Sequence, residues 1–157
     1  MADILDVAKY FLAKVDHDAG DEMTHLKLQK LCYYAQAWHL AINDKPLFDA
    51  EFQAWIHGPV SPQLWEHYKE YKYHPIDLPD DYDPNALTKE EEKFLDEVWD
   101  AYGRYTAKYL EYLTHQEDPW LEARQGLPPD AHCTNPISED TMKQYYRSLI
   151  DDGEETD

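Results

Sequence analysis

The segment Thr24–Ile42, THLKLQKLCYYAQAWHLAI, decides the fold, because it predicts one long helix that is apolar on two sides. At helical spacing its apolar residues form two seams, one through Leu28, Leu31, Ala35, Trp38 and Ile42 and the other through Leu26, Tyr33, Ala37 and Leu40. A helix with two apolar sides is buried among other elements, whereas a surface helix has one apolar stripe. Thr24 is suited to cap its start, and the turn residues 43–46 end it. We therefore predict a buried central helix over about residues 24–42.

After this helix the hydrophobic period changes towards two. Apolar residues at positions 52, 54 and 56 alternate with other residue types, which is the pattern of a short strand. We predict a small β-hairpin over about residues 47–57, in which Leu47–Phe48 pairs with this strand. Gly58 and Pro59 are expected to end the extended segment, and Ser61 before a proline to cap the next helix.

Amphipathic helices are predicted on both sides of this centre. Asp3 is expected to cap a first helix, and Thr88 with Glu91 to form a capping box. Further helices are expected after Thr106, at Asp118 and after residue 138, with an exposed loop over 74–87. The predicted fold class is α+β and predominantly α-helical, a compact multi-helix domain around the central helix with one small hairpin. Residues 1–150 are expected to form a single domain, and residues 151–157, DDGEETD, an acidic disordered tail.

Composition limits the partners that this chain can have. Acidic residues outnumber basic ones 33 to 14, which gives a formal net charge of −19. A field of that sign repels phosphate backbones and anionic membrane surfaces, so neither nucleic acid nor membrane is expected as a partner. A basic protein would be attracted, with an association rate that falls as salt rises. No stretch approaches the ~20 apolar residues of a membrane span, and two cysteines without a leader pattern suit a reducing cytoplasm.

The sequence contains only weak candidates for catalytic or metal-binding residues. The eight histidines are scattered, and the pair His132–Cys133 lacks the second half of a zinc-site spacing. His115, Glu117 and Asp118 place an imidazole and carboxylates within one turn, but capping and local hydrogen bonds account for the same residues. No nucleophile elbow, P-loop or dinucleotide-binding glycine motif is present. We therefore predict no catalytic residue, no metal site and no cofactor, and do not expect an enzyme.

Two segments are candidates for contact with a partner. The predicted partner-binding residues are Lys27, Lys30, Tyr34, Trp55, His57, Gly58, Pro59 and Val60. The first three share one helix face and form either a basic and aromatic patch or ordinary surface cations neutralised by neighbouring acids. The others lie in a run that either exposes aromatic and apolar surface at a rigid turn or simply makes that turn.

The acidic segment Asp77–Asp100 contains ten acids and two lysines. Such a run is most simply a solvated face. It also suits the imitation of nucleic acid in a basic cleft of another protein, and that alternative stays open.

Three short blocks, taken in order, resemble the Panacea domain, a SocA-like family of bacterial and phage antitoxins. They are Thr24–Trp38 (THLKLQKLCYYAQAW), Ala54–Val60 (AWIHGPV) and Leu113–Trp120 (LTHQEDPW). The resemblance implies a mainly helical domain with a small strand element. It also implies an antitoxin that neutralises a cognate protein toxin, encoded by the adjacent gene, through direct binding. Alternatives are an adaptor that delivers a toxin to a ClpXP-type protease, and a phage- or prophage-encoded acidic inhibitor of a host enzyme.

Overall fold

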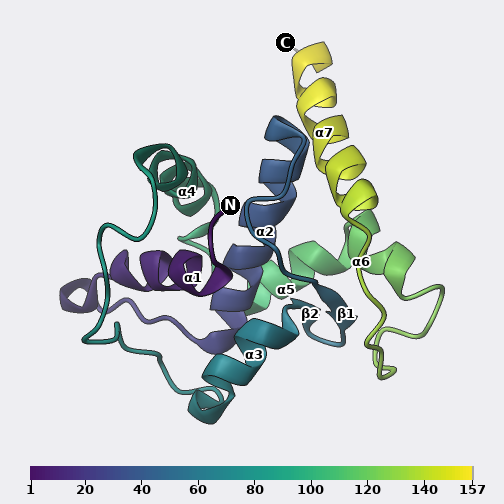
Figure 1. The fold of residues 1–157 in the computed structure, drawn as a ribbon. Helices are drawn as coiled ribbons and strands as arrows, with labels where there is room; N and C mark the ends of the chain where they lie inside the picture. The colour runs from purple at the N-terminus through teal and green to yellow at the C-terminus, as the bar shows by residue number, and fades with distance from the viewer. Residues whose placement is uncertain (157) are drawn as a thin grey trace.

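Helix α2 (His25–Asn43) lies at the centre of the molecule, and most of the other elements pack on it (Figure 1). The computed structural model describes residues 1–156, with side chains up to Asp151. Within these residues the other helices are α1 (Ile4–Ala13), α3 (Pro62–Tyr68), α4 (Lys89–Tyr102), α5 (Ala107–His115), α6 (Asp118–Ala123) and α7 (Glu139–Thr156), and the strands are β1 (Gln53–Trp55) and β2 (Gly58–Val60). Short 3-10 turns occupy His17–Ala19 and Lys69–Tyr71. The predicted α+β, predominantly helical fold is confirmed.

The central helix begins and ends where its sequence predicts. The Thr24 hydroxyl accepts a hydrogen bond from Lys27 N at 3.3 Å, which satisfies one of the free amides of the first turn. At the other end Asp44 adopts a left-handed conformation with φ 63°, which a short polar side chain tolerates. Leu28, Leu31 and Ala35 are wholly buried, but Ile42, predicted in the same seam, is 55% exposed beyond the reach of the core.

The hairpin is shorter and later than predicted. Strand β1 pairs antiparallel with β2 in the register Gln53↔Val60 and Trp55↔Gly58. Leu47–Phe48 was therefore the wrong partner, and Gly58 and Pro59 form the second strand instead of ending the first. Gly58 permits this reversal because its φ of 104° is open to glycine and strained for other residues.

Leu47 and Phe48 instead anchor the N-terminus. Ala2 N donates to Leu47 O at 2.9 Å, and Ala2 forms a parallel bridge with Phe48. The free edge of β1 is covered by the chain before α7, where Ala54 N donates to Asn135 O at 2.9 Å. The pairing partners of both segments are thus distant in sequence, which alternation alone does not reveal.

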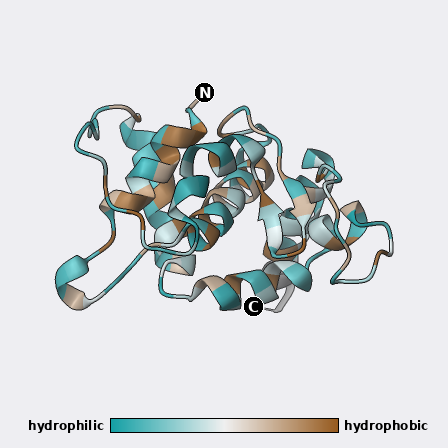
Figure 2. Ribbon diagram, turned by 90° about the horizontal axis from the view of Figure 1, so that it is seen from below, coloured by the Kyte–Doolittle hydropathy of each residue, from teal (hydrophilic) through white to brown (hydrophobic). Residues whose placement is uncertain are grey.

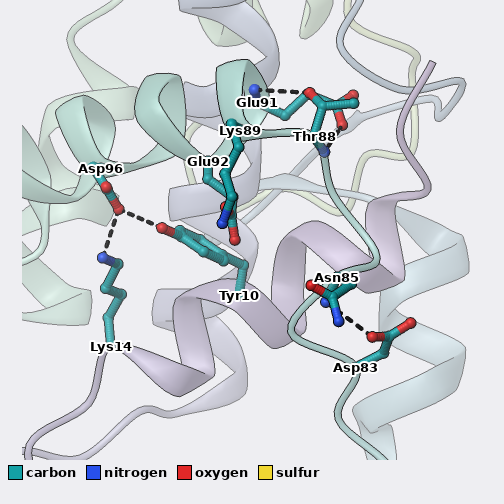
Figure 3. A network of polar contacts seen from close by, with 9 residues as sticks. All are labelled: Tyr10, Lys14, Asp83, Asn85, Thr88, Lys89, Glu91, Glu92 and Asp96. Carbon is teal, nitrogen blue, oxygen red and sulfur yellow. Dashed lines mark hydrogen bonds and ion pairs between the residues drawn. The ribbon is translucent and has the colours of Figure 1, made fainter.

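Helices α1 and α4 are joined by a polar network at the surface (Figure 3). Tyr10 donates from its hydroxyl to Asp96 Oδ1 at 2.6 Å, and Lys14 forms an ion pair with the same carboxylate. The predicted capping box is confirmed, since Glu91 N donates to Thr88 Oγ1 and Thr88 N to Glu91 Oε1. These contacts fix the acidic helix α4 on the outside of the core.

Buried apolar residues of the helices α1 to α7 and of β1 form one contiguous cluster. In Figure 2 the helices alternate between teal and brown as amphipathic helices do, and the loops are teal with some brown segments. The loop 74–87 is mostly exposed, but Ile76 is buried and its N–H donates to Met23 O at 2.7 Å. Within residues 1–156 no helix combines the length and the apolar character that a membrane crossing requires.

The backbone of α7 continues as a helix to Thr156. An acidic disordered tail was predicted over residues 151–157, and of this segment Asp157 and the side chains of residues 152–156 lie outside the described residues. It therefore stays a prediction, as does the assignment of residues 1–150 to a single domain.

Candidate partner-binding site

The central helix and the hairpin meet through buried polar side chains. Lys30 Nζ donates to Pro59 O at 3.1 Å, and its side chain is wholly buried. The preceding residue, Gln29, bonds Ser61 in both directions, accepting from Ser61 N at 2.8 Å and donating to Ser61 O at 3.2 Å. Because these bonds go to backbone groups, α2 fixes the position of β2 and of the start of α3.

Gly58 is required by the closeness of its neighbours as well as by its φ. A Cβ at this position would lie 2.5 Å from Lys30 Cε and 2.8 Å from Thr114 Oγ1. Both distances are shorter than real Cβ contacts allow. The three sequence blocks therefore converge here, because Lys30 of the first and Thr114 of the third both lie against Gly58 of the second.

Helix α6 holds the hairpin from the other side. Trp120 donates from its indole N–H to Trp55 O at 2.8 Å. Arg124 donates to Ala54 O at 2.8 Å and to the carbonyl oxygens of residues 128 and 131 at 2.8 Å and 2.6 Å. Asp118 and Pro119 begin α6 as predicted, so α6 and the residue that caps its end place two anchors beneath the hairpin.

A second polar cluster lies where α2, α7 and the start of α6 meet. Glu117 Oε1 accepts from the hydroxyl groups of Tyr34 at 2.7 Å and Tyr146 at 2.9 Å. Tyr146 OH lies 3.2 Å from Tyr33 OH, and the Tyr34 ring stacks on Tyr102 at 4.1 Å between centroids. One carboxylate thus joins three helices.

Burial changes the proton affinity of both clusters. It raises the pKa of Glu117 to about 7, although the hydrogen bonds from Tyr34 and Tyr146 oppose this by favouring the charged form. It lowers the pKa of the Lys30 amine to about 7, against a smaller opposing effect of the Glu111 carboxylate.

The predicted surface patch on α2 requires correction. Lys30 and Tyr34 are both 0% exposed, so neither is available at the surface. Lys27 is partly buried and donates to Gly103 O at 2.6 Å. The polar ends of all three side chains are satisfied inside the molecule by groups far along the chain, and local sequence does not reveal those groups. Any direct contact of Lys27 with a partner stays a prediction.

An apolar groove opens on the outer side of the hairpin. Its walls are Trp55, Ile56 and Val60 of the hairpin, Trp65 of α3 and Leu26 of α2, and its volume is about 310 Å³. The two tryptophan rings lie 5.8 Å apart between centroids. This volume is at the lower end of the roughly 300–1,000 Å³ typical of ligand pockets.

The predicted hairpin residues divide between the groove and the interior. Trp55, His57 and Val60 line the groove. His57 is exposed, and its Nδ1 lies 2.6 Å from Glu111 Oε1. Gly58 and Pro59 are buried against α2. Both interpretations of this segment therefore hold in part. Gly58 and Pro59 make the turn on the inner side of the hairpin, and Trp55 exposes aromatic surface on the outer side.

The prediction missed Trp65 and Gln29. Trp65 does carry a signal in the sequence, because it falls beside the seam of α3 that buries Leu64 and Tyr68. An aromatic residue off the core seam of an amphipathic helix indicates exposed apolar surface. Gln29 gives no such signal, since its partner Ser61 lies 32 residues away.

The residues around His115 do not converge on one point. The His115 ring stacks on Trp120 at 3.9 Å between centroids, and Glu117 turns towards the buried tyrosines. Cys32 is buried, which raises its thiol pKa, and Cys133 is buried beside the groove. Within the described residues no three His, Cys, Asp or Glu side chains are grouped closely enough to hold a metal ion.

The fold and these contacts define a small helical domain in which a buried helix supports a hairpin and an adjacent groove. The chain belongs to the family described as antitoxin SocA-like, Panacea domain, whose model matches residues 28–121, more than half of the chain. This range contains Lys30, Gly58, Thr114 and Trp120, whereas the anchor Arg124 lies just beyond it. Searches of curated proteins and of solved structures found no match.

Proposed function

We propose that this protein is an antitoxin of a toxin–antitoxin system, acting in the cytoplasm by binding a cognate protein toxin. Membership of the SocA-like antitoxin family carries the proposal. In this proposal binding, and not catalysis, inactivates the toxin, and the toxin is encoded by the adjacent gene.

The groove between the hairpin and α3 is the binding surface that the geometry supports best. Protein interfaces are dominated by a few aromatic and arginine residues in pockets that exclude water. Trp55 and Trp65 form such a pair, and the hairpin that carries Trp55 is anchored by Lys30, Trp120 and Arg124. A rigid aromatic surface loses little conformational entropy on binding.

Co-expression with the product of the adjacent gene tests the proposal. We expect that product to stop growth alone and to be harmless beside this protein. Trp65→Ala is expected to abolish protection, because it removes one wall of the groove. Ile42→Ala, a matched loss of exposed apolar surface at the other end of α2, is expected to leave protection intact. A harmless neighbour, or one still toxic with this protein present, would contradict the antitoxin proposal.

The half-life of the toxin separates neutralisation from delivery to a protease. If the protein neutralises by binding, the toxin stays present and inactive whether or not the ClpXP-type protease is available. Rapid loss of toxin only when the protease is present would replace this proposal with the adaptor alternative. Recovery of a host nucleic-acid enzyme in place of the toxin would favour the acidic-inhibitor alternative.

A further inference from the structure

No lining residue of the groove is acidic in a chain that contains 33 acids, and the acid that pairs with a lining residue is Glu111, whose Oε1 lies 2.6 Å from Nδ1 of His57. Its ionisable lining groups are His25, His57, His132, Lys72 and Cys133. His25 lies at the floor beside Gln29, with 3.0 Å between His25 Nε2 and Gln29 Nε2. Burial lowers the pKa of His25 to about 4, so the floor is neutral at pH 7. Any charge of the groove is therefore at its rim.

Lys72 is the permanent charge of that rim. It is exposed, and among the side chains that the structure describes no carboxylate lies within ion-pair distance of its amine. Its backbone has φ 54° and ψ −119°, a conformation that favours glycine. A lysine at a position suited to glycine costs stability, so the local backbone does not account for a lysine here.

We propose that the groove accepts one bulky apolar side chain of the partner protein, flanked in the partner's sequence by a carboxylate that pairs with Lys72. The volume of about 310 Å³ admits one bulky side chain and is too small to enclose a helix. The acid-free lining and the unpaired amine are complementary to a carboxylate. The inference rests on the proposed function for its claim that the occupant is a segment of a protein.

A preference of the groove for a carboxylate is compatible with the net charge of −19 on the whole chain. The whole field acts on the whole approaching partner and is screened beyond about 8 Å at physiological salt. Lys72 acts on the group seated next to it. A second copy of the chain is a poor occupant, because two molecules of this charge repel each other.

Two synthetic peptides test the inference without any knowledge of the toxin. Each carries a central tryptophan and leucine, flanked in one by aspartates and in the other by lysines. The signals of the indole N–H groups of Trp55 and Trp65 in NMR spectra report binding in the groove, and that of Trp99 on α4 reports non-specific attraction. At physiological salt the aspartate peptide is expected to shift the Trp55 and Trp65 signals with an affinity about tenfold above that of the lysine peptide.

Lys72→Gly separates recognition from structure. This variant relieves the backbone strain, so its thermal stability is expected to equal or exceed that of the wild type. Its preference for the aspartate peptide is nevertheless expected to disappear. Lys45→Ala removes an exposed charge at the other end of α2 and is expected to keep the preference.

Equal shifts from the two peptides, shifts from the lysine peptide only, or no shift would each overturn the inference. So would an unchanged preference in Lys72→Gly. Concentration-dependent broadening without any peptide would instead identify a second copy as the occupant, which also overturns it. Protection from the toxin is measured separately by co-expression, so the proposed function stands or fails independently of these results.

Discussion

Replacing Glu117 by glutamine is expected to make the protein more stable at pH 8 while leaving it nearly unchanged at pH 5. Glu117 is the partly buried carboxylate that accepts hydrogen bonds from Tyr34 and Tyr146. Glutamine keeps an oxygen that can accept both bonds but has no charge to bury. The comparison therefore isolates the cost of the buried charge from the loss of its hydrogen bonds.

The magnitude follows from the change in pKa. Burial raises the pKa of Glu117 from 4.5 to about 7 in the native state. Each tenfold change in proton affinity is worth about 1.4 kcal/mol, so the full effect is about 3 kcal/mol. Between these two values the native carboxyl keeps a proton that the unfolded chain has released. The contribution of this group to stability is therefore present in full below pH 4.5 and is lost as pH rises through 7.

Urea unfolding, followed by tryptophan fluorescence between pH 5 and pH 8, measures the difference. Relative to Glu117→Gln, the wild type is expected to lose about 2.5 kcal/mol across this range. Glu122→Gln, on an exposed glutamate of the same helix, is expected to follow the wild type at every pH. Parallel curves for wild type and Glu117→Gln would refute the reasoning. A wild type that gains on the variant as pH rises would show that the tyrosine hydrogen bonds outweigh burial.

Three further changes test the contacts around the hairpin. Gly58→Ala is expected to destabilise the fold by about 3 kcal/mol in urea unfolding, because its Cβ would collide with Lys30 and Thr114 at an unfavourable φ; a neutral result would mean that the hairpin moves away from α2 without cost. Lys30→Met is expected to gain stability relative to the wild type as pH falls from 10 to 7. The reason is that burial lowers the native pKa of the amine from 10.5 to about 7, so wild-type stability is lost over that range; a constant difference between the two unfolding curves would contradict this. Arg124→Ala is expected to cost about 3 kcal/mol and to broaden the NMR signals of β1, since three backbone carbonyl oxygens lose their donor; sharp, unshifted β1 signals would argue against its anchoring role.

Local signals in the sequence predicted the helices well. Each of these signals acts within a few residues: the cap at Thr24, the capping box at Thr88 and Glu91, and the turn after residue 42. A short stretch of sequence therefore contains both partners of each bond. The two seams of the central helix likewise follow from residue spacing alone. The family could also be identified at this level, because its blocks are runs of adjacent residues.

The site needed the tertiary structure because its contacts join distant segments. Lys30 and Tyr34 are residue types that are common on protein surfaces. Their burial is possible only because Pro59 O and the Glu117 carboxylate, 29 and 83 residues further on, accept their hydrogen bonds. A buried amine or hydroxyl is stable only where a partner satisfies it, and spacing along one helix carries no information about that partner. The sequence by itself thus determined the helices, the charge and the family. The tertiary structure decided which side of the hairpin is interior, because the Lys30–Gly58–Thr114 contact and the groove between Trp55 and Trp65 exist only after the three blocks have come together.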